Sequence, residues 1–450
     1  MSARRVVVVG GGLAGMSAAL NLADCGAEVT LLESRHRLGG LTWSFSRNDL
    51  TFDNGQHVFL RCCSEYRQFL ARIGSADGVY LQPSLDVPVL APGGLRSSIT
   101  RGALPAPLHL LPTLAHYRHL NLSDRVRVVR AALALRRLDP ADPSLDQVTF
   151  GSWLLARGQS EESIERLWNL IALPTLNLPA SEASLALAAK VFRTGLLDRG
   201  DAGDLGWPTL PLSDLHGGRG ARALEDAGVT TILGTRVKSV SMTDSGFVVT
   251  SREHAHVADA VIVATPPQVT RRVVPAGIVP TSTALGRSPI VNIHLVLDRR
   301  VTDIAMAAVV DSPIQFVFDR TATSGARSGQ CLAISLSAAD AFMAQPSEHL
   351  IRLFFEATQN LFPAGRHAEL LDGVVTREAA ATFRGVPGTA ALRPSTRTSV
   401  PGLYLAGAWC ATGWPDTMEG AVRSGHTAAS ACLEDVASLP LTRLSEKVAS

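Results

Sequence analysis

Lysine, aromatic residues and organised cysteines are all scarce in this 450-residue sequence. Aromatic residues make up 5%, the formal net charge is +2, and the lysines are Lys190, Lys238 and Lys447 only. With so little net charge, we expect no nucleic-acid partner. The six cysteines form no CxxC pair and no metal-ligand spacing. This pattern predicts reduced thiols in the cytoplasm and no metal site.

Long apolar runs, internal repeats and low-complexity linkers are also missing. No stretch reaches 18 consecutive apolar residues, so no membrane-spanning helix is expected. The first residues superficially resemble a signal peptide, but glycines interrupt the apolar stretch and no cleavage site follows. Hydrophobic residues nevertheless make up 46% and the mean hydropathy is +0.17. This surplus points to an apolar tunnel or to a surface that touches the inner face of the cell membrane.

The first 33 residues have the order expected of a dinucleotide-binding unit. The β-branched run at 4–9 is typical of a buried parallel strand and leads into a glycine loop at 10–15. A helix is expected from Met16 to Cys25, then a strand from Glu28 to Leu32, with Glu33 at its end. A glycine-rich loop without a nucleotide is the alternative.

The glycine spacing carries a physical reason at each position. Gly10 permits a tight turn, Gly12 lets the backbone approach a pyrophosphate, and Gly15 lets the helix pack on the strand. The helix N-terminus offers free N–H groups and the positive end of its dipole to the phosphates. Glu33 lies eighteen residues beyond Gly15, where a carboxylate can bind the ribose hydroxyls.

FAD and NAD both use this fingerprint, so the residues that follow it, Leu38-Gly39-Gly40, bear on which cofactor is bound. The pattern Glu33-x5-Gly39-Gly40 resembles the second glycine signature of the amine oxidase and phytoene desaturase flavoproteins, which implies FAD. An arginine commonly follows the glycine pair in that superfamily, whereas this chain has Leu41. Any phosphate contact at this point is therefore made by backbone atoms.

Several further segments resemble hydroxysqualene dehydroxylases, a branch of the same superfamily. They are DNGQHVFL at 53–60, SEESIERLWNL at 160–170, LPTLNLPASEAS at 173–184 and LYLAGAWCATGWPDTMEGAVRSG at 403–425. The resemblance implies a reductive loss of the allylic hydroxyl of hydroxysqualene, giving squalene, within bacterial squalene and hopanoid biosynthesis. Other enzymes of squalene synthesis are implied as partners.

The C-terminal segment also reads as part of the cofactor site. A strand at 402–405 turns at Ala406-Gly407-Ala408, and a small-residue helix opens at 417–421 and runs through Ala431. Its N-terminus would point at the flavin or at the ribityl and phosphate oxygens. Relatives often carry an aspartate where Ala408 stands. A final core helix packing on the sheet is the alternative.

We therefore predict an α/β fold with a Rossmann-like FAD-binding domain assembled from N-terminal, middle and C-terminal segments. Its parts are 1–75, 215–267 and 399–435, with a helical substrate domain at 76–214, an α+β substrate sheet at 268–398 and a mobile tail at 436–450. The middle part contains expected strands at 229–233, 236–240, 247–250 and 260–264, although a plain meander is the alternative. The cofactor contacts we expect are Gly10, Gly12, Leu13, Ala14, Gly15, Glu33, Gly39, Gly40, Gly55, Gln56, His57, Val237, Thr265, Gly407, Ala408, Met418, Glu419 and Ala421.

The substrate segments contain a predicted helix that Ser123-Asp124 cap, ending near Leu138. Val126, Val129, Ala132 and Leu133 are spaced along one helical face, beside arginines at 125, 127, 130, 136 and 137. That basic side suits a solvated bundle face or anionic lipid headgroups. The apolar segment at 104–114 suits a tunnel mouth or the core. Strands near 290–297, 314–318 and 331–336 would form a mixed sheet over the flavin.

Hydroxide departure needs an acid near the flavin, and the protein must stabilise a developing allylic cation. The candidates are His57, Asp416 and Glu419, with Gln56 orienting the alcohol or a water. Each acid candidate also has a structural alternative. His57 could be a pocket or core histidine, Asp416 a turn residue, and Glu419 an acid that the helix dipole favours in the first turn. Trp409 and Trp414 would line the channel or merely pack.

Three other functions stay open on sequence grounds. A carotenoid or phytoene-type desaturase would oxidise a C30–C40 isoprenoid on the same fold. An amine oxidase would need an aromatic cage, which we do not find. A lipid carrier would keep FAD for structure alone.

Overall fold

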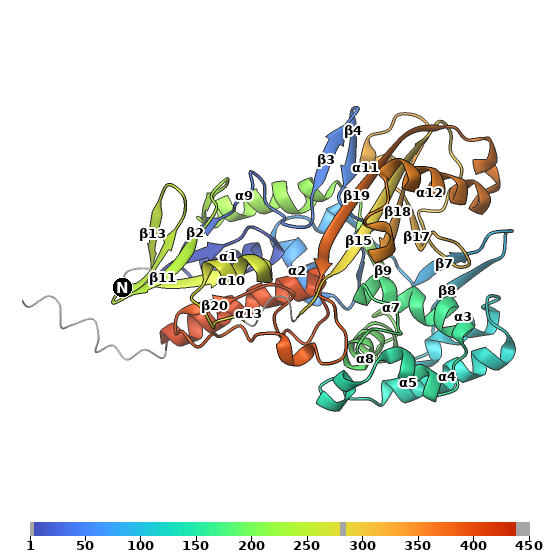
Figure 1. Cartoon of the computed structure of the whole chain (residues 1–450), viewed down its shortest axis with the longest axis horizontal. Coiled ribbons are helices and arrows are strands. Elements are labelled where there is room, and N and C mark those ends of the chain that lie inside the picture. Colours follow the sequence, from blue (N-terminus) through green and yellow to red (C-terminus); the bar gives the residue numbers. More distant parts are fainter. Residues whose placement is uncertain (1–3, 280–284, 438–450) are drawn as a thin grey trace, which may run out of the picture.

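The computed structural model describes residues 4–279 and 285–437, so the predicted tail beyond residue 437 lies outside it. Figure 1 shows three parts: a nucleotide-binding unit on the left, a large sheet at the upper right and a helical layer at the lower right. No helix in the described ranges is long and apolar enough to cross a membrane.

The nucleotide-binding unit is built on a five-stranded parallel sheet. Its order is β10 (Thr230–Ile232), β2 (Glu28–Leu32), β1 (Arg5–Val9), β14 (Ala260–Val263) and β20 (Leu403–Leu405). The valines at 6–9 of β1 are all buried, as expected of a central parallel strand. The predicted Rossmann-like assembly from three distant segments is confirmed.

Helices from the two ends of the chain join this sheet together. α1 (Leu13–Asp24) and α13 (Met418–Ala437) cross closely, and α9 (Arg219–Asp226) packs beside α1. At the crossing, Gly425 lies against the carbonyl of Ala14, where an added Cβ would collide with backbone. The Ser17 hydroxyl donates to the carbonyl of Val422 at 3.0 Å. The two ends of the sequence are thus one packing unit.

The strands of a small antiparallel sheet differ from those predicted from the sequence. It contains β11 (Ser239–Thr243), β12 (Gly246–Thr250) and β13 (Ala255–Ala258). The strand predicted at 236–240 is wrong in its start, and β13 was not predicted. Residues 234 and 235 are held instead by the chain after β2, because Thr235 N–H donates to the carbonyl of Glu33 at 2.8 Å.

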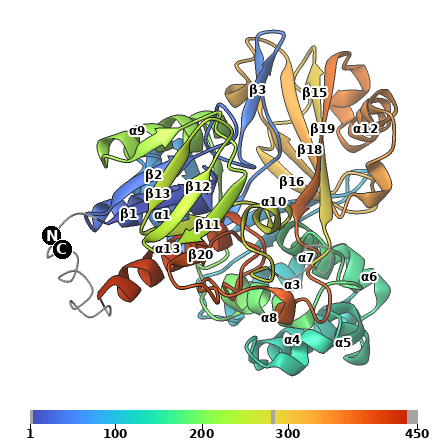
Figure 2. The ribbon, with the colours of Figure 1, turned by 60° about the vertical axis from the view of Figure 1, so that its left-hand side comes forward.

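The second part of the molecule is built on a seven-stranded mixed sheet, seen with its covering helix α12 (Ser347–Leu361) in Figure 2. Its order is β19 (Leu370–Thr382), β15 (Ser288–Leu297), β18 (Gln330–Ser337), β17 (Phe316–Asp319), β16 (Met306–Val309), β7 (Asp86–Leu90) and β8 (Arg96–Thr100). The predicted strands correspond to β15, β17 and β18, whereas β19, its longest strand, was not predicted. Since β7 and β8 come from the interval 76–214, that interval is not wholly helical.

The helical layer packs on this sheet around Phe150, Trp168 and Phe192. Its helices are α3 (Leu111–His116), α4 (Leu122–Arg136), α5 (Phe150–Ala156), α6 (Glu161–Ser163), α7 (Asn169–Leu176) and α8 (Leu185–Phe192). The predicted cap of α4 is wrong by two residues, because Asn121 Oδ1 accepts from Asp124 N–H. The buried residues of α4 are Asp124, Val128, Ala131 and Leu135, so the apolar face noted in the sequence is not the buried one.

Short elements connect the three parts. They are β3 (Ser44–Arg47), β4 (Leu50–Asp53), β5 (Phe59–Leu60), α2 (Ser64–Arg72), β6 (Val79–Leu81), β9 (Leu205–Pro208), α10 (Pro267–Val273) and α11 (Thr321–Ser324). β3 and β4 form a hairpin that projects at the top of Figure 1. The loop after β4 carries the DNGQH segment between the nucleotide-binding unit and the large sheet.

Candidate functional site

The glycine loop lies at the carboxyl ends of β1 and β2, held by Glu33. The Glu33 carboxylate accepts from Gly11 N–H at 2.6 Å, from Arg35 N–H at 2.8 Å and from the Ser34 hydroxyl at 3.1 Å. A carboxylate has about four acceptor positions, so one remains for a ribose hydroxyl. Gly10 has a φ of +108°, which L-residues rarely adopt.

Two other glycines of this loop differ in what surrounds them. A Cβ on Gly15 would collide with the carbonyl of Gly10, so the packing of α1 on β1 requires glycine there. A Cβ on Gly12 would meet nothing closer than the Cα of Gly40 at 3.7 Å, and φ of Gly12 is −78°. The protein itself would accept a side chain at Gly12. The open space beside it therefore fits a group from outside the chain, next to the N-terminus of α1.

Gly39 and Gly40 form the second wall of this space. Their φ values are +99° and +60°, and Gly39 N–H donates to the carbonyl of Gly11 at 2.9 Å. Arg37 donates to the carbonyl of Gly40 at 3.1 Å, and its guanidinium lies 4.4 Å from the Trp43 ring centroid. A cation therefore stands beside the glycine pair even though Leu41 replaces the expected arginine.

The middle segment contributes Val237 and Thr265 to the same edge. Val237 is buried, and among the described residues its backbone N–H and carbonyl have no hydrogen-bond partner. Buried backbone groups are rarely left unpaired, so this pair suits an adenine ring. The carbonyl of Thr265 accepts from the Trp409 indole at 3.1 Å. Trp409 is buried and packs against this turn.

The C-terminal turn closes the site from the opposite side. Gly407 has a φ of +141°, and its N–H donates to the Ser424 hydroxyl at 2.7 Å. The buried Ala408 directs its carbonyl to Arg393 at 2.9 Å. Met418 and Ala421 lie in the first turn of α13, whose N-terminus carries the positive end of a 20-residue helix.

The DNGQH segment is anchored by its first two residues. Asp53 is buried and forms an ion pair with Arg320 at 2.8 Å, and it also accepts from Leu212 N–H at 3.0 Å. The side chain of Asn54 accepts from Trp43 N–H at 3.1 Å and donates to the carbonyl of Leu41 at 2.8 Å. These contacts fix the loop that carries the buried Gly55 and the half-buried Gln56 and His57.

The large sheet holds the same segment from its other side. Asn292 of β15 accepts from Gln56 N–H at 3.3 Å and donates to the carbonyl of Asn54 at 3.2 Å. Thr376 of β19 donates to that carbonyl at 2.7 Å. The loop is therefore fixed by both halves of the molecule, and neither Asn292 nor Thr376 had a signal in the sequence.

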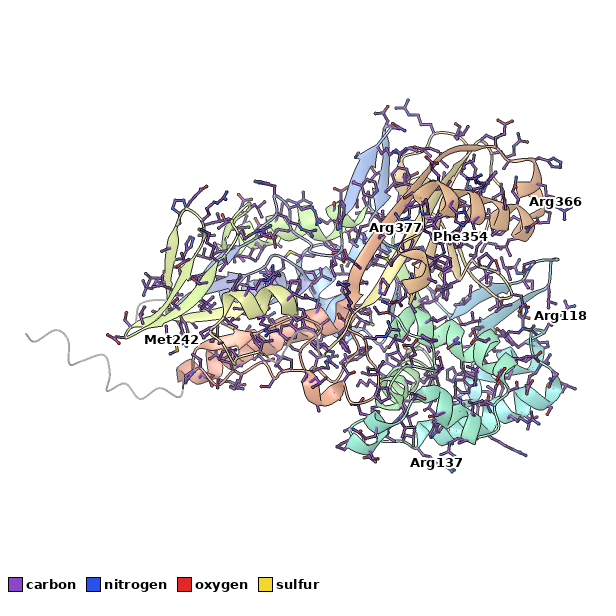
Figure 3. The ribbon with its side chains drawn as sticks, viewed as in Figure 1. Arg118, Arg137, Met242, Phe354, Arg366 and Arg377 are labelled. Atoms are coloured by element: carbon purple, nitrogen blue, oxygen red, sulfur yellow. The ribbon has the colours of Figure 1, made fainter. Side chains whose placement is uncertain are left out.

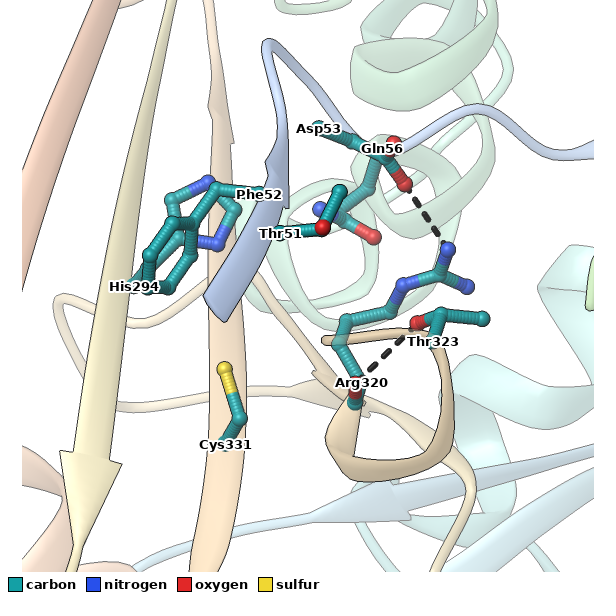
Figure 4. Close-up of a pocket in the computed structure, with 8 residues that line it drawn as sticks. All are labelled: Thr51, Phe52, Asp53, Gln56, His294, Arg320, Thr323 and Cys331. Atoms are coloured by element: carbon teal, nitrogen blue, oxygen red, sulfur yellow. Dashed lines mark hydrogen bonds and ion pairs between the residues drawn. The ribbon is translucent and has the colours of Figure 1, made fainter. Parts of the chain in front are cut away.

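A water-sized cavity of about 10 Å³ lies behind the loop (Figure 4). It is lined by Thr51, Phe52, Asp53, Gln56, His294, Arg320, Thr323 and Cys331. The Gln56 amide nitrogen and both ring nitrogens of His294 are buried without a protein partner. Burial lowers the pKa of His294 to about 4, so it is neutral at pH 7.

His57 is neutral for the same reason. Its pKa lies below the usual value because burial outweighs the hydrogen bond to the carbonyl of Gly55, 3.1 Å from Nδ1. His216 lies near it and is 2.8 Å from the Tyr66 hydroxyl. Burial lowers the pKa of His216 to about 3. His57 is thus a neutral hydrogen-bonding group and a weak source of protons at pH 7.

Asp416 has the opposite character. Burial raises its pKa to about 6, although its Oδ2 accepts from Phe383 N–H at 2.9 Å and Arg393 lies nearby. It is located in the turn before α13, where β19 ends. Among the described residues, Asp416 forms no hydrogen bond with His57 or Gln56.

Glu419 makes structural contacts within the fold. Its buried carboxylate accepts from the N–H groups of Glu65 at 3.3 Å and Tyr66 at 2.8 Å, which begin α2. It also pairs with Arg423 at 2.6 Å. Burial raises its pKa, but all these partners favour the ionised carboxylate. The contacts give Glu419 a capping role. The ring centroid of Trp414, in the preceding turn, lies 4.9 Å from the Lys190 ammonium and 5.0 Å from the Arg423 guanidinium.

Comparison with known proteins places this geometry in a family. A model of the flavin-containing amine oxidoreductases matches residues 13–433. The chain belongs to that family. Among curated relatives, the hydroxysqualene dehydroxylase of Sinorhizobium fredii is 28% identical and the zeta-carotene desaturase of Zea mays is 26% identical. The first alignment covers 96% of this chain and 99% of the relative, and the second covers 95% and 83%.

Solved structures agree on the fold. Putrescine oxidase bound to putrescine has a TM-score of 0.72 at 19% identity, covering 96% of this chain and 99% of that one. Cyclohexylamine oxidase from Brevibacterium oxydans has a TM-score of 0.71 at 20% identity, with coverage of 97% and 100%. As a member of the flavin-containing family, the protein is an FAD-dependent oxidoreductase, as the glycine signatures predicted.

The cofactor fits the residues of this flavoprotein. The open space at Gly12, the spare acceptor position of Glu33, the unpaired backbone of Val237 and the N-terminus of α13 lie along one edge of the sheet. Sequence reasoning missed Arg37, Asn292, Arg320 and Arg393. Only Arg37 had a sequence signal, because it lies within the glycine signature at 33–40.

Proposed function

We propose that this flavoprotein removes the allylic hydroxyl of hydroxysqualene reductively, giving squalene. Dehydroxylases that match almost from end to end support the assignment, including that of Zymomonas mobilis at 26% identity over 95% of this chain. The site observation that carries it is Asp416, a carboxyl whose pKa is raised to about 6. An acid near neutrality suits the protonation of a poor leaving group.

When bound and reduced, FAD supplies the hydride for this reaction. Asp416 donates a proton to the hydroxyl oxygen as the carbon–oxygen bond breaks, so that water leaves. The hydride and the proton together balance the loss of water and the new carbon–hydrogen bond. Gln56 orients a water through its unpaired amide nitrogen, because its side chain borders a water-sized cavity. Neutral His57 adds no positive charge beside the developing allylic cation.

A desaturase of C30–C40 isoprenoids is the second candidate, favoured by the zeta-carotene desaturase of Zea mays. The two reactions need opposite redox states, since a desaturation consumes oxidised flavin and a dehydroxylation consumes reduced flavin. Amine oxidases share the fold, but their sequence identities to this chain are too low to support the same substrate class.

An anaerobic assay separates the candidates. Dithionite-reduced holoenzyme is incubated with hydroxysqualene, and oxidised holoenzyme with squalene, phytoene or zeta-carotene, with products separated by chromatography. Squalene formed by the reduced enzyme alone supports the proposal. A more unsaturated product from the oxidised enzyme would establish the desaturase instead. Enzyme stripped of FAD is the control and forms neither product.

A further inference from the structure

Helix α4 is apolar on two opposite faces. Val128, Ala131 and Leu135 face the core and are buried. Leu122, Val126 and Leu133 face away from the protein and are 74%, 53% and 41% exposed. At 3.6 residues per turn, these three and Val129 fall within an arc of about 60° on the outer side of the helix. A solvated bundle helix has no reason to carry such a stripe.

Arginines border this outer stripe on both sides. By the same helical spacing, Arg125 and Arg136 lie along one border, and Arg130 and Arg137 lie along the other. Figure 3 shows Arg137 projecting from the lower edge of the helical layer. An apolar stripe flanked by arginines is the pattern of a helix that lies in a membrane interface. Arginine is suited to this position because its aliphatic stem follows the apolar stripe while its head reaches the phosphates.

The segment before α4 extends the same surface. Leu104, Leu108 and Leu111 are exposed. Arg125 joins the two elements, donating from Nη1 to the carbonyl of Ala115 at 2.8 Å and from Nε to that of Leu120 at 3.0 Å. In the described ranges, six of the fifteen large apolar residues classed as exposed fall between Leu104 and Leu133. This concentration exceeds the scatter expected of ordinary surface residues.

The positive charge of residues 102–138 favours an anionic partner. Residues 102–138 contain six arginines and one aspartate, whereas the whole chain has a formal net charge of +2. The remainder of the chain is therefore net negative. The one aspartate, Asp124, is buried against Asn121 and Arg127. Among nearby acids, Asp198 lies 3.8 Å from Arg136 and neutralises part of one border.

We propose that the outer face of α4, together with Leu104–Leu111, docks on an anionic lipid bilayer, with α4 in the plane of the interface. The inference goes beyond the reaction proposed above and does not depend on it, because it stands on exposure and charge alone. Docking would place the enzyme on the phase in which an isoprenoid hydrocarbon dissolves.

Sedimentation with vesicles tests the proposal. Holoenzyme is mixed with vesicles of phosphatidylcholine and phosphatidylglycerol, or of phosphatidylcholine alone. We expect binding to the first that weakens with salt. Arg130→Gln with Arg137→Gln should weaken it roughly 20-fold. Leu122→Ser with Val126→Ser and Leu133→Ser should weaken it at least roughly 10-fold.

A matched control uses exposed apolar residues elsewhere. Met242→Ser with Leu371→Ser, at positions 60% and 62% exposed, should leave vesicle binding unchanged. Retained FAD and an unchanged melting temperature show that each variant is folded. Equal loss in the control, or no binding by the unaltered protein, would overturn the proposal. The proposal would also be overturned if the unaltered protein formed a dimer on gel filtration and the triple serine variant did not. In that case a second copy of the chain would cover the outer face of α4.

The assay with detergent-dispersed hydroxysqualene keeps the two proposals distinct. The docking variants should turn over dispersed substrate as the unaltered enzyme does. An enzyme that binds anionic vesicles but forms no squalene would contradict the proposed reaction alone.

Discussion

Gly12 and Gly15 lack a side chain for different reasons. At Gly15 a Cβ would collide with backbone of the same protein, whereas at Gly12 the nearest atom is 3.7 Å away. The packing of α1 explains the glycine at position 15, and we propose that a bound pyrophosphate explains the one at position 12.

Gly12→Ala should therefore yield a folded apoprotein that binds FAD at least roughly 10-fold more weakly, because the methyl group occupies the pyrophosphate position. Flavin absorbance after purification and titration with FAD measure the effect. Gly15→Ala is the contrasting variant and should lower the melting temperature of the apoprotein itself. A Gly12→Ala protein that stays fully yellow would refute this explanation.

Asp416 should make both activity and stability depend on pH. Its pKa of about 6 in the folded protein lies above the ordinary value of 3.8. The folded state therefore holds the proton more tightly, and the free energy of unfolding should fall as the pH rises from about 4 to about 6. The acid form, which we propose donates the proton, is lost as the pH rises through about 6.

The rate of squalene formation by reduced enzyme should thus fall as the pH rises through about 6. Asp416→Asn should lower the rate roughly 100-fold or more and remove that inflection, because the amide has no proton to donate. Single-turnover assays across pH measure both effects. Asp298→Asn, at a carboxylate far from the site, is the control. An unaltered profile in Asp416→Asn would assign the acid elsewhere.

Among the elements, the crossing of α1 and α13 joins the two ends of the chain. The contact is close because Gly425 lies against the carbonyl of Ala14 and the Ser17 hydroxyl bonds to Val422. Both helices direct their N-termini toward the cofactor edge. Their separation would move two cofactor-binding groups at once.

Gly425→Leu should force the two helices apart, lowering the melting temperature by several degrees and reducing FAD content together. A loss of about 1–3 kcal/mol is typical of an overpacked contact. Thermal unfolding and flavin absorbance test this expectation. Gly218→Ala is a control at a helical glycine, where the nearest atom to an added Cβ is 3.8 Å away. Normal FAD content in Gly425→Leu would show that the crossing does not position the cofactor site.

The DNGQH loop is the element that joins the cofactor unit to the large sheet. The Asp53–Arg320 pair is buried on both sides, and such a pair favours one arrangement because either charge left alone is costly. Asn292 and Thr376 add bonds from β15 and β19. The sequence indicated that this segment matters, but it could not indicate which distant residues hold it.

At the scale of the whole molecule, one dinucleotide site draws on segments more than 400 residues apart. The parallel sheet places the carboxyl ends of β2, β1, β14 and β20 along one edge, where ligands bind in doubly wound folds. The seven-stranded sheet and the helical layer that packs on it form the rest of the molecule. This arrangement separates the cofactor end from the exposed apolar face of α4.

Local patterns alone determined the cofactor unit. Valine runs, glycine positions and the acid at Glu33 act over a few residues, and their physical meaning does not depend on distant packing. The same holds for the strands at 260–264 and 402–405 and for the final helix.

Tertiary structure alone decided the rest. Helical periodicity revealed an apolar stripe on α4, but only packing showed that this stripe faces outward. The raised pKa of Asp416 and the capping contacts of Glu419 come from partners that are remote in sequence. Burial and long-range pairing are properties of the folded chain, so no local pattern could have distinguished these two acids.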